Sequence, residues 1–246
     1  MQHYIEGKTI IITGGSSGFG KATAKMLLEC GANVVISARR ESILQEALAE
    51  LGGGEACMAI AADATSSDDW KRLVDATVER FGALDVLINC HGNGGNIAPL
   101  ETQTDDDIRT TLDINLTGVL LGCREAVRVM KPNGRGHIVN VSSACAGHAW
   151  ANWSVYTAAK AGLITFTRCL HMEMSEWGGK ATNFIPGAAR TNFCENCDLD
   201  VELPEEFPAS EDFARTLVHC VDVPDNTVIE EVKVWGTAQV KSFDRF

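Results

Sequence analysis

Tyr156 and Lys160 stand four residues apart in Tyr156-Thr157-Ala158-Ala159-Lys160, a segment whose residues predict a helix. On a helix their side chains lie one turn apart on nearly the same face, about 6 Å apart along the axis. An ammonium at that distance favours the phenolate and lowers the pKa of a phenol from its usual value of about 10. Tyr156 could then exchange a proton with an alcohol or a carbonyl compound. The spacing alone suits a core tyrosine equally well, so other motifs must decide.

A glycine-rich turn is the second feature that suits chemistry. Residues 13–20 read Thr-Gly-Gly-Ser-Ser-Gly-Phe-Gly and stand between a short apolar run and a segment of helical pattern. Glycines at such a turn let the backbone approach a pyrophosphate, which the N-terminus of the following helix attracts. A turn that binds nothing is the alternative. The cofactor contacts predicted here are those of Gly14, Ser16, Ser17, Gly18, Phe19 and Gly20.

The residues that end the next apolar run bear on the choice of cofactor. An acidic side chain at that place binds the ribose 2′-hydroxyl of NAD(H), whereas arginine accommodates the 2′-phosphate of NADP(H). The run ends Ser37-Ala38-Arg39-Arg40, without an acid. Ser37 and the guanidinium groups of Arg39 and Arg40 can bind a phosphate. The sequence therefore predicts that NADP(H) is preferred, with NAD(H) as a second cofactor, unless the two arginines merely begin a surface helix.

These residues need a framework, and the alternation of apolar runs with longer amphipathic stretches predicts one. Strands are expected at 8–13, 33–38, 56–61, 84–89, 137–141, 182–185 and 228–235. Helices are expected near 18–30, 40–51, 68–81, 105–130, 154–177 and 211–221. Parallel neighbours need crossover connections, which helices supply. We therefore expect an α/β fold, a doubly wound, seven-stranded parallel sheet of the Rossmann type with helices on both faces.

Length and composition agree with a single domain that spans residues 1–246. Of the 246 residues, 45% are hydrophobic and 22% are charged, and no low-complexity linker divides the chain. No apolar run suits a membrane span and the N-terminus lacks a signal-peptide pattern, so we expect a cytoplasmic protein. The net charge of −12 argues against nucleic acid as a partner.

The cysteines give little indication of a metal site. There are nine, dispersed along the chain, which favours reduced thiols over a disulfide framework. Cys194 and Cys197 form the only close pair, and no second pair or histidine motif completes a zinc site, so no metal is expected. The same region, residues 195–212, carries eight acids and no base, a pattern that usually marks a solvated loop.

Six motifs in order make the chain resemble the short-chain dehydrogenase/reductase family over nearly its full length. Beyond the glycine-rich turn they are Asp63-Ala64, Asn89-Cys90-His91-Gly92, Asn115 within residues 113–118, Ser142-Ser143 taken together with Tyr156 and Lys160, and Pro186-Gly187 followed by Thr191. Ser143, thirteen residues before Tyr156, matches the family's serine better than Ser142 does. The resemblance implies cofactor contacts from Asp63, Ala64, Asn89, His91, Gly92, Tyr156, Lys160, Pro186, Gly187 and Thr191.

The resemblance also implies a catalytic group of Asn115, Ser143, Tyr156 and Lys160. Tyr156 would be the acid when a ketone is reduced and the base when an alcohol is oxidised, while Ser143 holds the substrate oxygen. Lys160 would lower the pKa of Tyr156 and bind the nicotinamide ribose. Asn115 would hold a water that links Lys160 to solvent. His91 stands where the family usually has alanine, and we expect its imidazole to be packed or hydrogen-bonded rather than catalytic.

Residues after the fourth, fifth and sixth predicted strands should line the substrate pocket. They are Asn93, Gly94, Cys145, His148, Trp150, Trp153 and Ala188. Tryptophans suit a small or mid-sized, partly apolar substrate, although they would also suit a subunit interface. Residues 191–212 are expected to form a short acidic lid, which disfavours anionic substrates unless Arg190 lies inside the pocket.

We therefore expect an NADP(H)-dependent oxidoreductase that interconverts a small secondary alcohol, such as a 3-hydroxy acid, and its ketone, or that acts on a small aldehyde. A hydroxysteroid or polycyclic alcohol dehydrogenase is the alternative. A dinucleotide-binding regulator without turnover is a third reading, which the four catalytic residues disfavour. Apolar residues in the segments 105–130 and 154–177, together with the resemblance, imply a homotetramer or else a homodimer.

Overall fold

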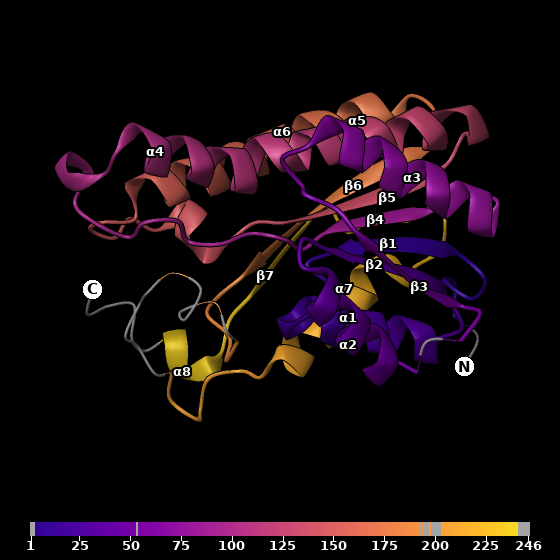
Figure 1. The fold of residues 1–246 in the computed structure, drawn as a ribbon, viewed down its shortest axis with the longest axis horizontal. Helices are drawn as coiled ribbons and strands as arrows, with labels where there is room; N and C mark the ends of the chain where they lie inside the picture. Colours follow the sequence, from indigo (N-terminus) through magenta and orange to yellow (C-terminus); the bar gives the residue numbers. More distant parts are fainter. Residues whose placement is uncertain (1–2, 53, 192, 194–196, 198–202, 241–246) are drawn as a thin grey trace.

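The protein is built on one seven-stranded sheet in which every neighbouring pair of strands is parallel, as the sequence predicts (Figure 1). The structure, a computed structural model, describes residues 3–240 except 53, 192, 194–196 and 198–202. The strands lie in the order β3-β2-β1-β4-β5-β6-β7. Their bounds are β1 (Thr9–Thr13), β2 (Asn33–Ala38), β3 (Cys57–Ala61), β4 (Val86–Asn89), β5 (Gly136–Val141), β6 (Gly179–Pro186) and β7 (Glu231–Val234). The order reverses between β1 and β4, and a ligand crevice is expected at the carboxyl ends of the strands there.

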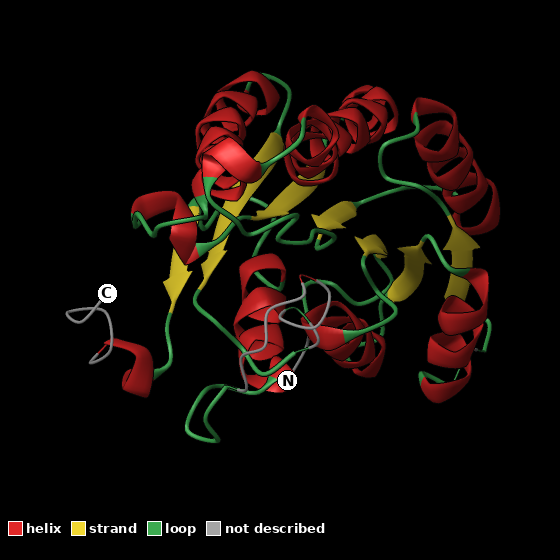
Figure 2. Ribbon diagram, turned by 60° about the vertical axis from the view of Figure 1, so that its left-hand side comes forward, coloured by secondary structure: helices red, strands yellow, loops and turns green. Residues whose placement is uncertain are grey.

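Helices cover both faces of the sheet, which is twisted between the two layers in Figure 2. One layer holds α3 (Ser67–Phe81), α4 (Asp105–Leu112), α5 (Gly118–Met130) and α6 (Ser154–Ser175) (Figure 1). The other holds α1 (Gly18–Glu29), α2 (Glu41–Glu50) and α7 (Ser210–Val221). Single-turn helices at Leu100–Thr102, Lys131–Asn133 and Ala144–Gly147, and the short α8 (Thr237–Val240), were not expected from the sequence. Within the described residues, no helix is long and apolar enough to cross a membrane.

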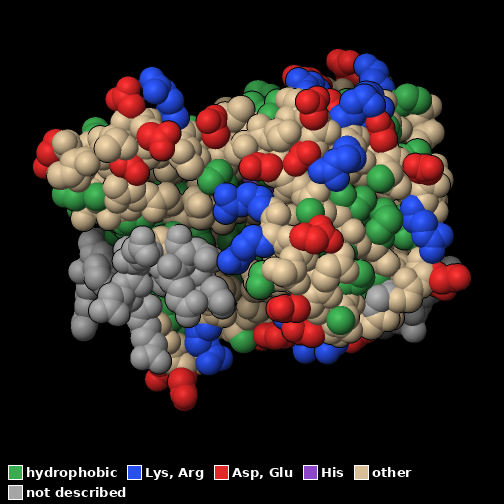
Figure 3. Space-filling view, in the orientation of Figure 1, with side chains coloured by type: hydrophobic (Ala, Val, Ile, Leu, Met, Phe, Trp, Pro, Cys, Tyr) green, Lys and Arg blue, Asp and Glu red, His purple; other side chains and the backbone are tan. Residues whose placement is uncertain are grey.

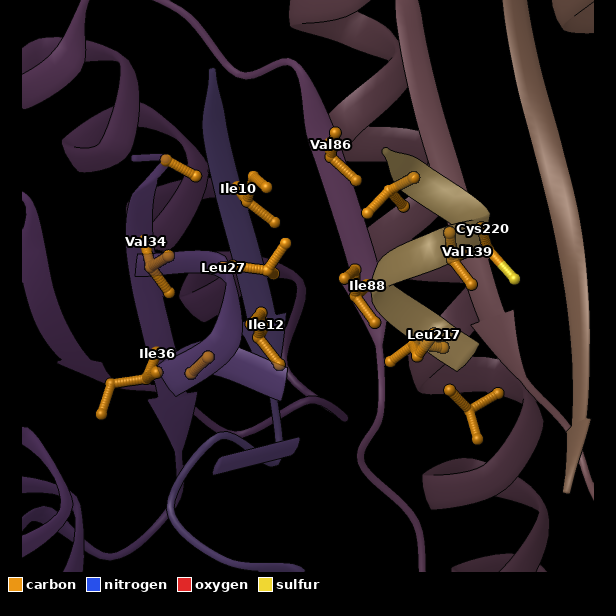
Figure 4. Packing of buried hydrophobic residues seen from close by; sticks show 14 of the residues in the cluster. Ile10, Ile12, Leu27, Val34, Ile36, Val86, Ile88, Val139, Leu217 and Cys220 are labelled. Carbon is orange, nitrogen blue, oxygen red and sulfur yellow. The ribbon is translucent and has the colours of Figure 1, made fainter. Parts of the chain in front are cut away.

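The two apolar cores follow from the alternation of side chains along the central strand. In β1, Ile10 and Ile12 point into the core shared with α1 and α7, where Leu27 and Leu217 also lie (Figure 4). Ile11 points to the opposite face and joins the core under the other helical layer. A strand that is buried on both faces is mostly apolar, and β1 carries three isoleucines between two threonines, all five of them buried. The core therefore fixes where β1 ends and where the turn at residues 13–20 begins.

The helix expected over residues 105–130 is interrupted, which corrects that prediction. The chain forms α4, then a π-helical turn at Asp113–Thr117, and then α5. Asn115 lies in this turn, is fully buried, and donates from Nδ2 to the carbonyl oxygens of Asn93 (2.8 Å) and Thr111 (2.9 Å). π-turns occur often at functional sites because they add a residue to one turn and redirect side chains. Hydrophobic periodicity does not signal such an insertion.

In the layer formed by α3 to α6, most of the apolar side chains pack against the core of the same chain. Leu163 and Leu170 of α6 are buried, and Leu121, Val127 and Phe166 pack against the core. Acidic and basic side chains are interspersed over the helices on the face drawn in Figure 3. The apolar face expected to pair with another subunit is therefore smaller than the sequence suggested.

Candidate active site

A cavity of about 920 Å³ lies at the carboxyl ends of the strands, where the switch in strand order predicts a ligand site. Its walls include residues at or just after the ends of β1 to β6: 13, 14, 16–20, 37–40, 62–65, 90–93, 141–145, 186–189 and 191. Tyr156 and Lys160 of α6 complete the wall beside β5. The fold thus brings residues of all six sequence motifs to one cavity; in the motif around Asn115, Ile114 lines it and Asn115 itself does not.

Tyr156 and Ser143 meet at the centre of the cavity. Ser143 follows β5, and its hydroxyl accepts a hydrogen bond from the backbone N–H of Cys145 at 3.2 Å. Tyr156 projects from the first turn of α6 and is 5% exposed. The Ser143 hydroxyl lies close enough to the phenol to favour its charged form, and this effect opposes the larger effect of burial on the pKa of Tyr156. Two neighbouring hydroxyl groups at a cavity wall can hold one substrate oxygen between them.

The pKa of Tyr156 lies above the ordinary value for a tyrosine, contrary to the expectation that Lys160 lowers it. Burial of the phenol is the largest cause, and the nearby thiols of Cys145 and Cys197 add to it. The Lys160 Nζ lies 5.8 Å from the centroid of the Tyr156 ring rather than at its hydroxyl. Desolvation therefore outweighs the cation in the surroundings that the chain provides. Tyr156 is a protonated phenol here, which is the form that gives a proton to a carbonyl oxygen.

Lys160 is a buried cation held by the strand next to it. Its Nζ donates to the carbonyl oxygen of Val141 at 3.1 Å, and its own carbonyl oxygen accepts from the hydroxyl of Ser142 at 2.8 Å. Burial lowers its pKa to about 8. Ser142 thus ties the α6 backbone to the end of β5. Both serines line the cavity, and the assignment of Ser143 as the catalytic serine stays a prediction.

Asn115 and Lys160 converge on the same point beside Gly92. A Cβ atom added at Gly92 would lie 2.8 Å from Asn115 Oδ1 and 3.3 Å from Lys160 Nζ. Asn115 Oδ1 is buried and has no hydrogen-bond partner among the described residues. A buried acceptor and a buried donor at one point suit a bridging water, since buried polar groups are normally satisfied. The geometry agrees with the expected role of Asn115 in proton exchange.

The turn that follows β1 has the shape expected of a dinucleotide cradle. Gly14 has a φ of +68°, and a Cβ atom there would lie 3.1 Å from the backbone of Cys90 and His91. A Cβ atom at Gly20 would collide with the Gly14 carbonyl oxygen. Ser17 precedes α1 and makes no side-chain capping bond. The N–H groups of the first turn of this helix can therefore donate hydrogen bonds to an anion. The residues present therefore fit a pyrophosphate.

The far end of the cavity carries the side chains expected to distinguish the two cofactors. Ser37, Arg39 and Arg40 all line it, and both arginines are exposed. Asp63 also lines the cavity, and its carboxylate accepts hydrogen bonds from the backbone N–H and the hydroxyl of Thr65, each at 2.8 Å. This end thus combines the guanidinium groups of Arg39 and Arg40 with the Asp63 carboxylate, which is hydrogen-bonded to Thr65 in its own loop.

His91 is a packed imidazole, as expected. Its Nδ1 lies 2.7 Å from the hydroxyl of Thr13, and its ring centroid lies 6.1 Å from that of Trp70. Burial is the main reason that its pKa falls to about 3, and the Lys160 charge adds to the effect. His91 therefore stays neutral through the physiological range, and the structure gives it a place at the cofactor wall rather than in proton transfer.

Four of the predicted site residues do not line the cavity, namely Asn89, Gly94, Asn115 and His148. Asn89 is buried and donates to Asn140 Oδ1 at 2.8 Å, and its contact with the cofactor stays a prediction. Gly94 is covered by Cys197, whose Sγ accepts from the Gly94 N–H at 2.9 Å. His148 lies behind Trp150, with the ring centroids 6.0 Å apart.

The substrate end of the cavity is mostly apolar and aromatic. The predicted residues Asn93, Cys145, Trp150, Trp153 and Ala188 line it. Further residues that were not predicted from the sequence also line this end: Ala149, Ala151, Ala189, Phe193, Leu203, Phe207 and Gln239. Phe193 lies against Tyr156 with the ring centroids 5.9 Å apart. The apolar residues at 203 and 207 were a signal that could have been used, but the acids around them suggested only a solvated segment.

Two further expectations concern charge and metal at this end. Arg190, expected as a possible anion-binding group, donates from Nε to the carbonyl oxygen of Phe207 at 3.0 Å and is exposed. It is not among the lining residues, so Lys160 is the one cation at the substrate end within the described residues. Cys194 and residues 195, 196 and 198–202 of the acidic segment lie outside these residues. No group of three or more potential metal ligands occurs in the described part of the chain.

Comparison with known proteins identifies the family. The short chain dehydrogenase family model matches residues 8–201. The chain is 38% identical over 216 residues to (5R,7aS)-5-hydroxy-7a-methyl-1-oxo-2,3,5,6,7,7a-hexahydro-1H-indene-carboxyl-CoA reductase of Mycobacterium tuberculosis, covering 86% of this chain and 81% of that protein.

Solved structures agree with the sequence comparison. Levodione reductase superposes with a TM-score of 0.87 at 27% identity, covering 96% of this chain and 99% of that one. A 3-ketoacyl-(acyl-carrier-protein) reductase from Brucella melitensis, solved with NADH, superposes with a TM-score of 0.85 at 27% identity, covering 95% and 98%. These likenesses extend over nearly the whole chain and include the strands and helices that carry Ser143, Tyr156 and Lys160. The protein is a member of the short-chain dehydrogenase/reductase family of oxidoreductases.

Proposed function

We propose that the protein is an NADP(H)-dependent oxidoreductase that interconverts a ring ketone and its secondary alcohol, with Tyr156 as the acid and base. The observation that carries the proposal is the meeting of Tyr156 and Ser143 at the aromatic end of a cavity whose other end is a dinucleotide cradle. The bound nicotinamide supplies or accepts the hydride. The residues of this chain supply position, polarity and the proton.

Each polar residue has a task that follows from its geometry. The Ser143 hydroxyl donates to the substrate oxygen and supports the charge that develops there. Tyr156 gives its proton to that oxygen during reduction, a step that suits a phenol kept protonated by burial. Lys160 and Asn115 hold the water beside Gly92 from which the proton is replaced. In alcohol oxidation the same groups remove a proton in the reverse order.

The preference for NADP(H) rests on charge at the far end of the cavity. Arg39 and Arg40 line the wall there with Ser37, and residues 37–40 include no carboxylate. An arginine at this place favours a 2′-phosphate, because the guanidinium binds phosphate oxygens in a bidentate manner. Asp63 is the nearest acid in the lining, but its carboxylate is engaged by Thr65.

The lining of the substrate end favours a ring over the small hydroxy acid expected from the sequence. A hydroxy acid needs a cation for its carboxylate, and Arg190 is directed to Phe207 instead. Trp150, Trp153 and Phe193 provide flat apolar surfaces, which suit the faces of a ring. The relative from Mycobacterium tuberculosis is named for a substrate with a fused-ring ketone, which supports the same reading. A polycyclic alcohol dehydrogenase, the runner-up from the sequence, is thus compatible with this pocket.

A substrate panel tests the proposal. Substituted cyclohexanones, a bicyclic ketone and 3-oxo acids would be offered with NADPH and with NADH, and cofactor oxidation would be followed at 340 nm. We expect the highest kcat/KM with a ring ketone and NADPH, and loss of that activity in Tyr156→Phe. Higher kcat/KM for a 3-oxo acid would overturn the substrate class. Cofactor binding without turnover of any member would instead favour a dinucleotide-binding regulator.

We further propose that two chains pair through the outer faces of α4, α5 and α6, and that a second contact at the C-terminal strand β7 joins two such dimers into a homotetramer. Leu112, Leu116 and Leu120 follow one another at four-residue spacing along this layer, and each is half-buried in one chain. Half-buried leucines in a row suit a helix-to-helix contact. Sedimentation velocity at micromolar protein tests this, and an active monomer would show that the leucines need no partner.

A further inference from the structure

A row of five aromatic rings runs from the end of the sheet to the catalytic tyrosine. The successive centroid distances are 5.4 Å for Trp235 and His148, 6.0 Å for His148 and Trp150, 6.4 Å for Trp150 and Trp153, and 5.6 Å for Trp153 and Tyr156. Three of these contacts are edge-to-face and one is stacked. Both arrangements are favourable for aromatic pairs at such distances.

His148 lies between Trp235 and Trp150 in this row. Its imidazole is stacked on Trp150 with an interplanar angle of 17°, and Trp235 meets it at 74°. Its Nδ1 lies 3.3 Å from the carbonyl oxygen of Ala144, which ties the ring to the single-turn helix after Ser143. His148 itself does not line the cavity and is exposed at its rim. The imidazole therefore touches the back of Trp150, and Trp150 presents another side to the cavity.

Trp235 is held against the same strand end that carries the pocket wall. It follows β7, and a Cβ atom at Gly187 would lie 3.0 Å from Trp235 Cε3. Gln239 of α8 fixes this packing further, because its Nε2 donates to the carbonyl oxygen of Ala188 and its Oε1 accepts from the Gly236 N–H at 3.0 Å. The C-terminal segment thus holds Trp235 in place, and the His148 ring packs against Trp235.

The row reaches the cavity only at its substrate end. Trp150 and Trp153 line only the substrate end, next to Cys145 and Tyr156, whereas the cofactor turn and the two arginines lie at the other end. A change in the orientation of the Trp150 indole would alter the surface that a substrate ring meets. It would leave the Ser143 hydroxyl and the Tyr156 phenol in place, since these are held by the Cys145 backbone and by burial in α6.

We propose that His148 and Trp235 are positioning residues that hold Trp150 as a wall of the substrate site and thereby select ring-shaped over open-chain ketones. The selectivity part of this inference rests on the proposed function, because it takes a ring ketone as the substrate. The positioning part does not, since it concerns the orientation of an indole in the protein itself.

The first test measures the positioning alone. Coupled tryptophans give near-ultraviolet circular dichroism bands that depend on their mutual orientation. We expect His148→Ala to change the bands of the Trp150 and Trp153 pair, and His148→Phe to retain them because phenylalanine keeps a flat ring in the stack. His219→Ala is the matched control, since His219 is also an exposed histidine but lies on α7 away from the cavity. Spectra of His148→Ala and wild type that coincide would refute the positioning role.

The second test measures selectivity. We expect His148→Ala and Trp235→Ala to raise KM for a substituted cyclohexanone about 3- to 10-fold, the equivalent of one lost aromatic contact, with kcat and the NADPH dissociation constant unchanged. KM for an open-chain ketone such as 2-heptanone should remain the same, and His148→Phe should restore the cyclohexanone value. Equal changes for both ketones, or a parallel loss of NADPH affinity, would show a general structural role and overturn the inference.

Failure of the proposed function is distinguishable from failure of this inference. A wild-type protein that reduces neither ketone would contradict the proposed function, while the dichroism of the same variants would still decide whether His148 positions Trp150. A wild-type protein that prefers the ring ketone, together with variants that keep this preference, would contradict only the inference.

Discussion

The Lys160 ammonium lies 5.8 Å from the centroid of the Tyr156 ring, and its Nζ donates a 3.1 Å hydrogen bond to the carbonyl oxygen of Val141. The cation is therefore anchored by β5 while the phenol is presented by α6. This arrangement leaves the Tyr156 hydroxyl to Ser143 and the substrate. It also makes the protonation of Lys160 and that of Tyr156 separable in experiment, because burial moves their pKa values in opposite directions.

Removing the phenolic hydroxyl should remove the proton donor and little else. We expect Tyr156→Phe to lower kcat about 10²- to 10⁴-fold, the usual contribution of a general acid. The phenylalanine ring keeps the contacts with Trp153 and Phe193, so the dissociation constant for NADPH, measured by fluorescence titration, should stay close to that of wild type. A variant that retains near-wild-type kcat would exclude Tyr156 as the acid.

The pH dependence of ketone reduction should report Lys160. Burial lowers its pKa to about 8, so the ammonium is present below that pH and is lost above it. Tyr156 remains protonated over this range because its pKa is raised. We therefore expect kcat/KM to be level from about pH 6 to 7.5 and to fall above about pH 8. Lys160→Arg should abolish the fall, since a guanidinium does not titrate there.

A fall in kcat/KM on the acidic side, near pH 6, would contradict this account. That pH would indicate a histidine, and His91 is the one that lies at the cavity wall. Its pKa of about 3 excludes such a limb. His91→Ala should consequently leave the shape of the profile unchanged between pH 5 and 7, whatever it does to the rate.

Reversing the charge at residue 39 should change the choice of cofactor. Arg39→Asp places a carboxylate where the 2′-phosphate is expected and offers an acceptor to a ribose hydroxyl. We expect the ratio of kcat/KM for NADPH to that for NADH to fall about 10- to 100-fold, the value of one or two hydrogen bonds to a charged group. Arg109→Asp, an exposed change on α4, is the control and should leave the ratio as it is. A wild-type preference for NADH would contradict the proposal itself.

The framework could be predicted from the sequence because it follows from local patterns. Buried parallel strands are mostly apolar, as the three consecutive isoleucines of β1 show, and they alternate with amphipathic helices. The positions of Tyr156 and Lys160 followed from helical spacing in the same way. The π-turn around Asn115 escaped prediction because its extra residue leaves the apolar pattern of α4 and α5 intact.

The errors at the site arose where tertiary packing decides the outcome. The pKa of Tyr156 depends on how deeply the phenol is buried, which residue spacing does not show. His148 was expected in the pocket because of its place in the chain, but Trp150 lies between it and the cavity. Gln239 comes from α8, fifty-one residues after Ala188 to which it bonds, and no motif links the two. Long-range contacts of this kind require the fold.

The water site inferred beside Gly92 gives the last prediction. An alanine methyl group there would lie 2.8 Å from Asn115 Oδ1 and 3.3 Å from Lys160 Nζ, and it would occupy the space between them. We expect Gly92→Ala to lower kcat for alcohol oxidation about 10- to 100-fold, because the proton taken by Tyr156 can no longer pass to solvent along a positioned path. Gly147→Ala is the control, since nothing lies within 4 Å of the added atom there. The variant should also show a larger solvent deuterium isotope effect on kcat than wild type, as proton transfer becomes slower than hydride transfer. If the rate of Gly92→Ala falls only through a weaker affinity for the cofactor, with the isotope effect unchanged, Gly92 shapes the cofactor wall and the water between Asn115 and Lys160 has no part in turnover.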